Sequence, residues 1–183
     1  MRIVAGKLRS LKIETPKGEE ITRPTADRIK EAVFSSIGPY FYGGRILDCY
    51  GGSGSISFEA ISRGMDEADI FEIDPNAIAC IKRNAKRFKI ESQIHLHQED
   101  VLTHLETLDQ RYDLIYLDPP YKKQKNGQLI QKISELDLLT DNGYLLVESL
   151  KEDMLDERIG SYVCVKTKNY GITKISYYKR SVR

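Results

Sequence analysis

Residues 45–64, with the sequence RILDCYGGSGSISFEAISRG, decide the fold because their character changes twice over a short distance. The first part, 45–50, is short and mostly apolar, which predicts a buried β-strand. The glycine-rich GGSGS ends that strand, and the segment 55–64 then places apolar residues at helical spacing, with Gly64 as a stop signal. A strand, a tight glycine turn and a helix in this order are typical of the first unit of a doubly wound α/β sheet.

The same alternation continues toward the C-terminus. Further strands are predicted over 68–73, 94–97, 112–117 and 143–149. Helices are predicted between them, over 75–88, 101–108 and 127–136. Because the strands are mostly apolar, they should form a parallel sheet covered by helices on both faces. Two last strands, near 162–168 and 173–179, flank a short turn at Tyr170-Gly171, which favours an antiparallel hairpin.

The first 44 residues follow another pattern. RIVAG and SLKIET are short strand-like runs, and residues 25–38 read as an amphipathic helix with Thr25 as N-cap and Gly38 as stop. We therefore predict two parts. Residues 1–44 would form an appended hairpin plus helix, and residues 45–183 would form the α/β core.

Composition is that of a water-soluble globular domain, with 183 residues, 40% hydrophobic and 30% charged. The net charge is only +1, but it is unevenly distributed: residues 1–30 carry +4, residues 31–165 carry −9 and residues 166–183 carry +6. Basic ends on an acidic body suggest a phosphate-binding surface. They are equally compatible with termini that only keep the chain in solution.

We expect neither a membrane-spanning segment nor a metal site. No apolar run approaches the length of a membrane span, and the first residues lack the apolar stretch of a secretory signal, so we expect a cytoplasmic protein. The three cysteines lie far apart with no CxxC pair. His95 and His97 are close, but no cysteine or histidine cluster supports them at zinc-finger spacing, so we expect no metal.

The glycine loop, Asp48 to Gly54, is the first candidate for ligand binding. Glycines after the first strand of such a sheet let backbone N–H groups approach a ligand closely. A Walker loop is excluded because no Gly-Lys-Ser/Thr follows, and GGSG is not GxGxxG. The loop alone is compatible with NAD, a nucleotide phosphate or S-adenosylmethionine.

Acidic residues after the next two strands are candidates for binding a ribose and an adenine, and an acid after the second strand fits NAD and S-adenosylmethionine equally. Glu72 follows the second strand, where an acid can accept hydrogen bonds from both ribose hydroxyls. Asp74 precedes Pro75 at a helix start, so we assign it as a helix cap and keep Glu72 for the ribose. The Asp100 carboxylate could accept a hydrogen bond from an adenine amine, and the Val101 N–H could face a ring nitrogen. Capping the following helix is the alternative role for Asp100.

The tetrapeptide Asp118-Pro119-Pro120-Tyr121, directly after the fourth strand, is the catalytic candidate. The exocyclic amine of a nucleic-acid base is a poor nucleophile, because its lone pair is delocalised into the ring. The Asp118 carboxylate and the Pro119 carbonyl could hold the two amine hydrogens and orient that lone pair. Consecutive prolines make the turn stiff, and Tyr121 can stack on the base. A plain strand-ending turn is the alternative reading.

These motifs together resemble the RsmD family, which methylates the N2 amine of a guanine in small-subunit (16S) ribosomal RNA. The resemblance covers essentially the whole chain. It is carried by RIVAGKLR (2–9), TRPTADR (22–28), LDCYGGSG (47–54), EAISRG (59–64) and DPPY (118–121). One departure is Tyr50-Gly51-Gly52, where the family usually has Phe-Ala-Gly.

The resemblance implies a class I S-adenosylmethionine-dependent methyltransferase, with strand order 3-2-1-4-5-7-6. Combined with the motifs above, the candidate cofactor residues are Asp48, Tyr50, Gly51, Gly52, Gly54, Glu72, Ile73, Asp100, Val101 and Asp118. The substrate would be ribosomal RNA, met within a small-subunit assembly intermediate where the base is accessible. The basic residues assigned to RNA contact are Arg2, Lys7, Arg9, Arg23 and Arg28, although Arg23 and Arg28 could instead brace the 25–38 helix.

Three other functions are compatible with parts of the pattern. Adenine-N6 methylation of DNA also uses a DPPY-type turn, but only 44 residues lie outside the core, too few for a separate target-recognition domain. Protein-amide methyltransferases usually carry Asn where this chain has Asp118. A catalytically silent RNA-binding assembly factor is the alternative outside enzymes.

Overall fold

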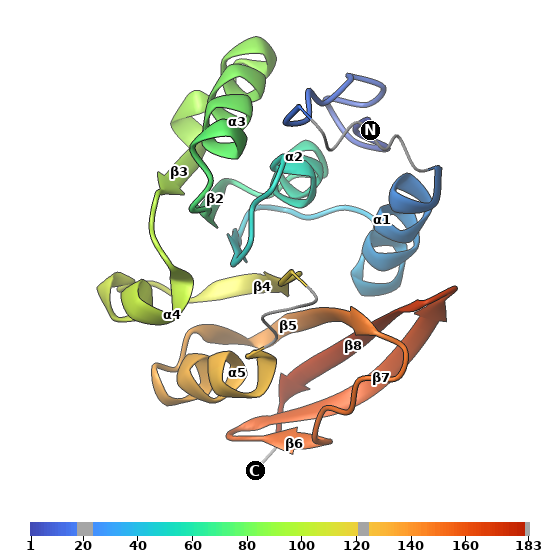
Figure 1. The fold of residues 1–183 in the computed structure, drawn as a ribbon, viewed down its shortest axis with the longest axis vertical. Coiled ribbons are helices and arrows are strands. Elements are labelled where there is room, and N and C mark those ends of the chain that lie inside the picture. The colour runs from blue at the N-terminus through green and yellow to red at the C-terminus, as the bar shows by residue number, and fades with distance from the viewer. Residues whose placement is uncertain (18–23, 121–124, 182–183) are drawn as a thin grey trace. The chain divides into compact units, whose positions relative to one another are not determined.

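The structure, a computed structural model, describes residues 1–17, 24–120 and 125–181 (Figure 1). It divides into two compact units, Met1–Asp100 and Val101–Arg183. Each unit contains both helices and strands. The division of the chain into an extension over 1–44 and a core over 45–183 remains a prediction.

The first unit contains three parallel strands in the order β3-β2-β1: β1 (Arg45–Asp48), β2 (Glu67–Phe71) and β3 (Ile94–His97). Asp48, the last residue of β1, is paired in register with Ile70 of β2. Ile46, Leu47 and Ile70 are fully buried, as expected for strands covered on both faces. The carboxyl ends of these strands therefore lie at one edge, where the predicted cofactor residues follow them.

Two helices of this unit begin as the sequence predicts. In α2 (Ser55–Ser62), the N-cap Gly54 has a φ of 79°, a left-handed conformation that favours glycine. In α3 (Pro75–Phe88), the Asp74 side chain accepts a hydrogen bond from the Asn76 N–H at 3.0 Å. The assignment of Asp74 as a helix cap is confirmed. A short 3₁₀ turn, η1 (Glu91–Gln93), leads into β3.

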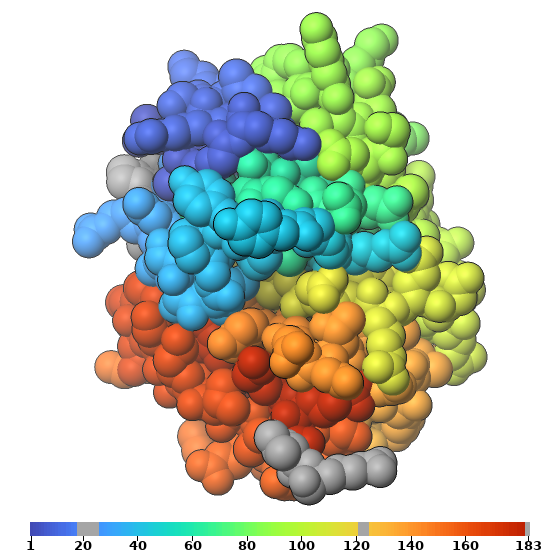
Figure 2. All heavy atoms as spheres, turned by 180° about the vertical axis from the view of Figure 1, so that it is seen from behind, coloured from blue at the N-terminus to red at the C-terminus, as the bar shows by residue number. Residues whose placement is uncertain are grey.

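The N-terminal segment doubles back on itself before α1 (Pro24–Ile37), but the predicted hairpin has only one β-bridge, between Arg2 and Lys12. Its backbone groups bond elsewhere. The N–H groups of Val4 and Ala5 donate to the Glu59 carboxylate of α2 at 2.8 and 3.0 Å. The segment is therefore attached to helix α2 instead of forming a regular ladder. Figure 2 shows it, in dark blue, on the surface of this unit.

The second unit contains five strands in the order β4-β5-β8-β7-β6. They are β4 (Tyr112–Leu117), β5 (Leu139–Leu150), β6 (Arg158–Ile159), β7 (Tyr162–Tyr170) and β8 (Thr173–Arg180). The β4–β5 pair is parallel and the other pairs are antiparallel. The predicted closing hairpin is confirmed, with Gly171 in the turn at a φ of 62°. Strand β6 was not predicted, because two residues give no periodic signal.

With β6 set aside, β7 and β8 are the sixth and seventh strands, so this order matches the 4-5-7-6 half of the expected topology. The helical segments are α4 (Val101–His104), η2 (Leu105–Thr107) and α5 (Asn126–Glu135). Helix α5 buries Leu129, Ile130 and Ile133 and packs against β5 and β6. Among the described residues, no helix is both long enough and apolar enough to cross a membrane.

Candidate active site

The glycine loop is tied to the end of β2 by its own backbone. The Gly51 N–H donates to the Phe71 carbonyl at 2.8 Å, and the Gly54 N–H donates to the Gly51 carbonyl at 2.7 Å. A Cβ added at Gly51 would lie only 2.4 Å from Cγ2 of the buried Ile70. Glycine at position 51, where the family usually has alanine, therefore leaves room for the Ile70 side chain in this protein.

Gly52 is required for a different reason. Its φ is 53°, and a Cβ there would meet nothing within 4 Å. The residue is thus glycine because of its backbone conformation, and the space beside it is open. A cradle of this kind can accept a ligand close to the backbone.

Glu72, which directly follows β2, holds the glycine loop in place through hydrogen bonds. One carboxylate oxygen accepts from the Gly52 N–H at 2.7 Å, and the other accepts from the N–H groups of Ile73 and Asp74, both at 2.8 Å. A carboxylate has about four lone-pair sites, so acceptor capacity remains for hydroxyl groups. Beside it, the Ile73 side chain is 61% exposed, which leaves an apolar surface at this edge.

Asp48 is the buried acid of the loop. It is 2% exposed, and its carboxylate accepts from the Ser57 hydroxyl at 2.9 Å. Burial raises the pKa of Asp48 to about 6, and the nearby Glu72 charge adds to the shift, while hydrogen bonds from Ser57 and the Tyr50 backbone oppose it. The half-buried Tyr50 has its pKa raised to about 12, again mainly by burial. Asp48, Gly52 and Glu72 thus belong to one connected cluster.

Cys49 lies in the core, with 1% exposure. Burial raises the pKa of its thiol, and the Asp48 charge raises it further. A thiol that resists ionisation is a poor nucleophile. The chemistry of this loop therefore does not run through cysteine.

The remaining predicted site residues follow β3 and β4. Asp100 is exposed at the end of the first unit, and Val101 is buried as the first residue of α4 in the second. Strand β4 ends at Leu117, and Asp118 directly after it is exposed, while Pro119 is buried. The Asp118 side chain is thus at the surface on a backbone held by the core. Tyr121 lies outside the described residues.

Four predicted RNA-contacting residues, Arg2, Lys7, Arg9 and Arg28, are exposed on the first unit, and Arg23 lies outside the described residues. The Lys7 ammonium donates to Gln93 Oε1 at 3.2 Å. Within the described chain, neither Arg9 nor Arg28 makes a hydrogen bond or ion pair through its side chain. The helix-bracing alternative for Arg28 therefore finds no contact among the described residues.

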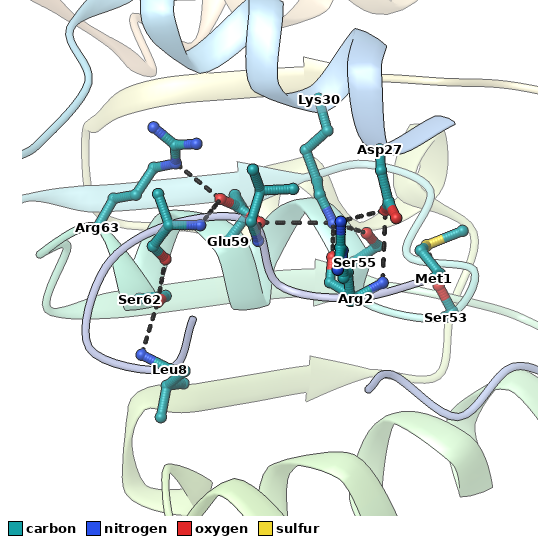
Figure 3. A network of polar contacts seen from close by, with 12 residues as sticks. Met1, Arg2, Leu8, Asp27, Lys30, Ser53, Ser55, Glu59, Ser62 and Arg63 are labelled. Atoms are coloured by element: carbon teal, nitrogen blue, oxygen red, sulfur yellow. Dashed lines mark hydrogen bonds and ion pairs between the residues drawn. The ribbon is translucent and has the colours of Figure 1, made fainter. Parts of the chain in front are cut away.

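The polar cluster in Figure 3 was not predicted from the sequence. Glu59 of α2 is fully buried, yet it accepts from two backbone N–H groups and pairs with Arg63 Nε at 2.8 Å and Lys30 Nζ at 3.4 Å. The Lys30 ammonium also donates to the Arg2 carbonyl at 2.6 Å. Burial lowers the pKa of Lys30, and the charges of Glu59 and Asp27 partly offset that effect.

A signal for this cluster was present in the sequence. Glu59 and Arg63 are four residues apart, so their side chains share one helix face, and Glu59 stands in the sequence among the buried apolar residues Phe58, Ala60 and Ile61. The cluster fastens the N-terminal segment and α1 to α2. No group of three or more potential metal-ligating side chains occurs in the ranges 1–17, 24–120 and 125–181.

The family of this chain follows from its similarity to known proteins. The model of the family described as conserved hypothetical protein 95 matches residues 1–179. YlbH of Bacillus subtilis is 35% identical over 98% of this chain and 99% of its own length. The ribosomal RNA small subunit methyltransferase D of Haemophilus influenzae is 31% identical over 98% and 93%. A solved structure of a conserved hypothetical protein from Streptococcus pyogenes has a TM-score of 0.79 at 36% identity, covering 83% of this chain and 95% of that one.

Proposed function

Because this chain belongs to the family of conserved hypothetical protein 95, we propose that it transfers a methyl group from S-adenosylmethionine to the N2 amine of a guanine in small-subunit ribosomal RNA. The enzyme is an rRNA methyltransferase with the fold of the class I methyltransferases, as its relatives are. The observation that supports the reaction is the exposed carboxylate of Asp118 on a stiff double-proline turn at the end of β4.

The first unit offers the features that the cofactor requires. Glu72 has acceptor capacity for ribose hydroxyls, the backbone at Gly52 leaves open space, and Ile73 exposes an apolar surface suited to a purine ring. Asp48, Tyr50, Gly51 and Gly54 build the loop that carries these groups. Asp100 and Val101 are assigned to the adenine edge. When bound, S-adenosylmethionine would supply an electrophilic methyl group on a sulfonium.

The residues after β4 orient the nucleophile. The Asp118 carboxylate and the Pro119 carbonyl accept the two hydrogens of the base amine, which aims the nitrogen lone pair. When nitrogen has bonded to carbon, it carries one proton too many, and Asp118 is an acceptor for it. Pro120 stiffens the turn, and Tyr121 stacks on the base. The rate gain comes from orientation and from preorganised charge.

Small subunits from a strain that lacks this protein provide the test. We expect the purified protein to methylate their 16S RNA at one guanine, identified by mass spectrometry of nuclease digests. Asp118→Ala should abolish transfer while the affinity for the cofactor stays within about tenfold. Full activity in this variant would refute the catalytic assignment.

The same assay separates the other functions. Transfer to duplex DNA, with none to small subunits, would favour adenine-N6 methylation of DNA. RNA binding with no transfer to any substrate would favour a silent assembly factor. Supplying early assembly particles beside mature subunits tests whether an assembly intermediate is the true substrate.

A further inference from the structure

Within the second unit, a cavity of about 320 Å³ lies between the first turn of α5 and the loop after β5. None of its described lining residues belongs to the acidic turn at 118–120. Four residues separate Pro120 from Lys125 at the start of α5, so an extended chain would place them at most about 18 Å apart. The cavity is thus a feature distinct from the catalytic turn but close to it along the chain.

Asn126, the first residue of α5, distinguishes this cavity from an ordinary surface hollow. It lines the cavity and is only 3% exposed, yet its side-chain oxygen and nitrogen have no hydrogen-bond partner among the described residues. Leaving such an amide buried and unpaired costs on the order of 1–3 kcal/mol. A residue that costs stability in the free protein is explained if a ligand supplies the missing partners.

The start of α5 adds open donors to the same wall. Lys125 occupies the N-cap position, and no side chain in the described part of the protein caps the helix. The first N–H groups of a helix have no partner within it. A Cβ at Gly127 would meet nothing within 4 Å, so the wall has free space in front of it.

The opposite wall is held rigidly. The Asp153 carboxylate accepts from the Leu150 N–H at 2.9 Å, and the Lys174 ammonium bonds the Asp153 carbonyl. The Tyr178 hydroxyl donates to the Asp156 carbonyl at 2.7 Å. These bonds fix the loop backbone in place. The Asp156 side chain is exposed on that loop, and Met154 beside it is 91% exposed.

The lining selects the chemistry of the ligand. Asp153 and Asp156 contribute two carboxylates against one ammonium from Lys125, which disfavours a phosphate. An amide such as Asn126 presents a donor beside an acceptor and pairs with the edge of a nucleobase. Carboxylates suit base amino groups, and Met154 and Ile159 provide apolar surface for a flat ring. The volume is at the small end for ligand pockets, which suits a single base.

We propose that this cavity holds a purine of the substrate RNA that carries an exocyclic amine, beside the guanine that is methylated, with Asn126 reading its edge. This inference rests on the proposed action on RNA. It makes Asn126 a specificity residue that binds the substrate without touching the reacting atoms.

A nucleoside titration tests the cavity without any catalysis. Isotope-labelled protein, saturated with S-adenosylhomocysteine to fill the cofactor site, is titrated with guanosine, inosine or inorganic phosphate. We expect guanosine to shift the NMR signals of the Asn126 side-chain amide and the Met154 methyl group. Inosine, which lacks the 2-amino group, should bind several-fold more weakly. Absence of a guanosine shift at these two residues, or a larger shift with phosphate, would overturn the proposal.

Variants then connect the cavity to the RNA. Asn126→Leu removes an unpaired amide, so it should fold at least as stably as the wild type. It should raise KM for unmethylated small subunits about tenfold, with kcat changed less than about twofold. Gln131→Ala is the matched control, because Gln131 lies on the same helix and bonds only Glu135 at 2.9 Å among the described residues. Asp156→Asn, on the opposite wall, should also raise KM and weaken guanosine binding.

The two proposals fail in distinguishable ways. If the wild type methylates small subunits and Asn126→Leu and Asp156→Asn leave KM unchanged, the cavity proposal is wrong and the proposed function stands. If the wild type methylates no ribosomal RNA, the proposed function is wrong, and the guanosine titration still decides whether the cavity binds a base.

Discussion

Two buried acids in the first unit, Glu59 and Asp48, have very different surroundings. Glu59 is fully buried, but two backbone N–H groups and the cations of Lys30 and Arg63 surround it. Asp48 is 2% exposed, has no cation in contact among the described residues, and has its pKa raised to about 6 by burial. A compensated buried charge serves the fold, whereas a poorly compensated one marks a site where a ligand is expected.

Breaking the compensated cluster should give the largest effect. Glu59→Gln leaves the buried Arg63 without its counter-charge, and the buried Lys30 then keeps an ion pair with Asp27 alone among the described residues, at 3.6 Å. We expect a loss of about 3–5 kcal/mol in the free energy of unfolding, measured by urea denaturation. Glu67→Gln is the control, because Glu67 pairs with Arg45 at the surface at 3.0 Å and should cost less than about 1 kcal/mol. Equal losses in both variants would remove the distinction between the two kinds of acid.

Asp48 should make stability depend on pH in a defined direction. Its pKa in the folded protein, about 6, lies above its ordinary value of 3.8, so the folded state holds the proton more tightly. The associated stability is complete below about pH 4 and is lost as the pH rises through about 6. Asp48→Asn should therefore be more stable than the wild type at pH 8 by up to roughly 3 kcal/mol, with a smaller difference at pH 4.

Urea midpoints of both proteins at pH 4 and pH 8 give the measurement. A difference that does not change with pH would mean that Asp48 titrates normally, and the contrast with Glu59 would then lose its electrostatic basis. Ser57→Ala serves as the companion variant, because it removes the hydroxyl that donates to Asp48 at 2.9 Å. Without that donor, the pKa of Asp48 should rise further.

The sequence predicted most of the fold because its signals are local. Apolar runs located β1 to β5, and Asp74 before Pro75 predicted the cap of α3, which the structure confirms. Strand β6 and the attachment of the N-terminal segment to Glu59 escaped prediction. The first is too short to show a period, and the second joins residues more than fifty positions apart, a separation that no local pattern records.

The candidate site, like the fold, was predictable from the sequence only in part. The order of glycine loop, acid and DPPY turn was readable as a motif, because each part directly follows a strand. The sequence did not reveal that Glu72 holds the Gly52 backbone, nor that the buried Asn126 side chain finds no partner in the part of the chain that the structure describes. Both depend on how distant parts of the chain pack together.

Exposed charges on the N-terminal segment and on α1 should give the smallest effect and extend the comparison to a third kind of charge. Arg9 and Arg28 are exposed and unbonded within the described residues, so Arg9→Ala and Arg28→Ala should change the free energy of unfolding by less than about 0.5 kcal/mol. If each contacts an RNA phosphate, each variant should reduce the slope of log affinity against log salt by about one. Filter binding to 16S RNA across a salt series measures that slope.

Lys151→Ala on the second unit removes another exposed cation and is the control for net charge. A slope that falls equally in all three variants would show that RNA senses only the total charge, and a slope that does not change in the arginine variants would remove these residues from the RNA surface.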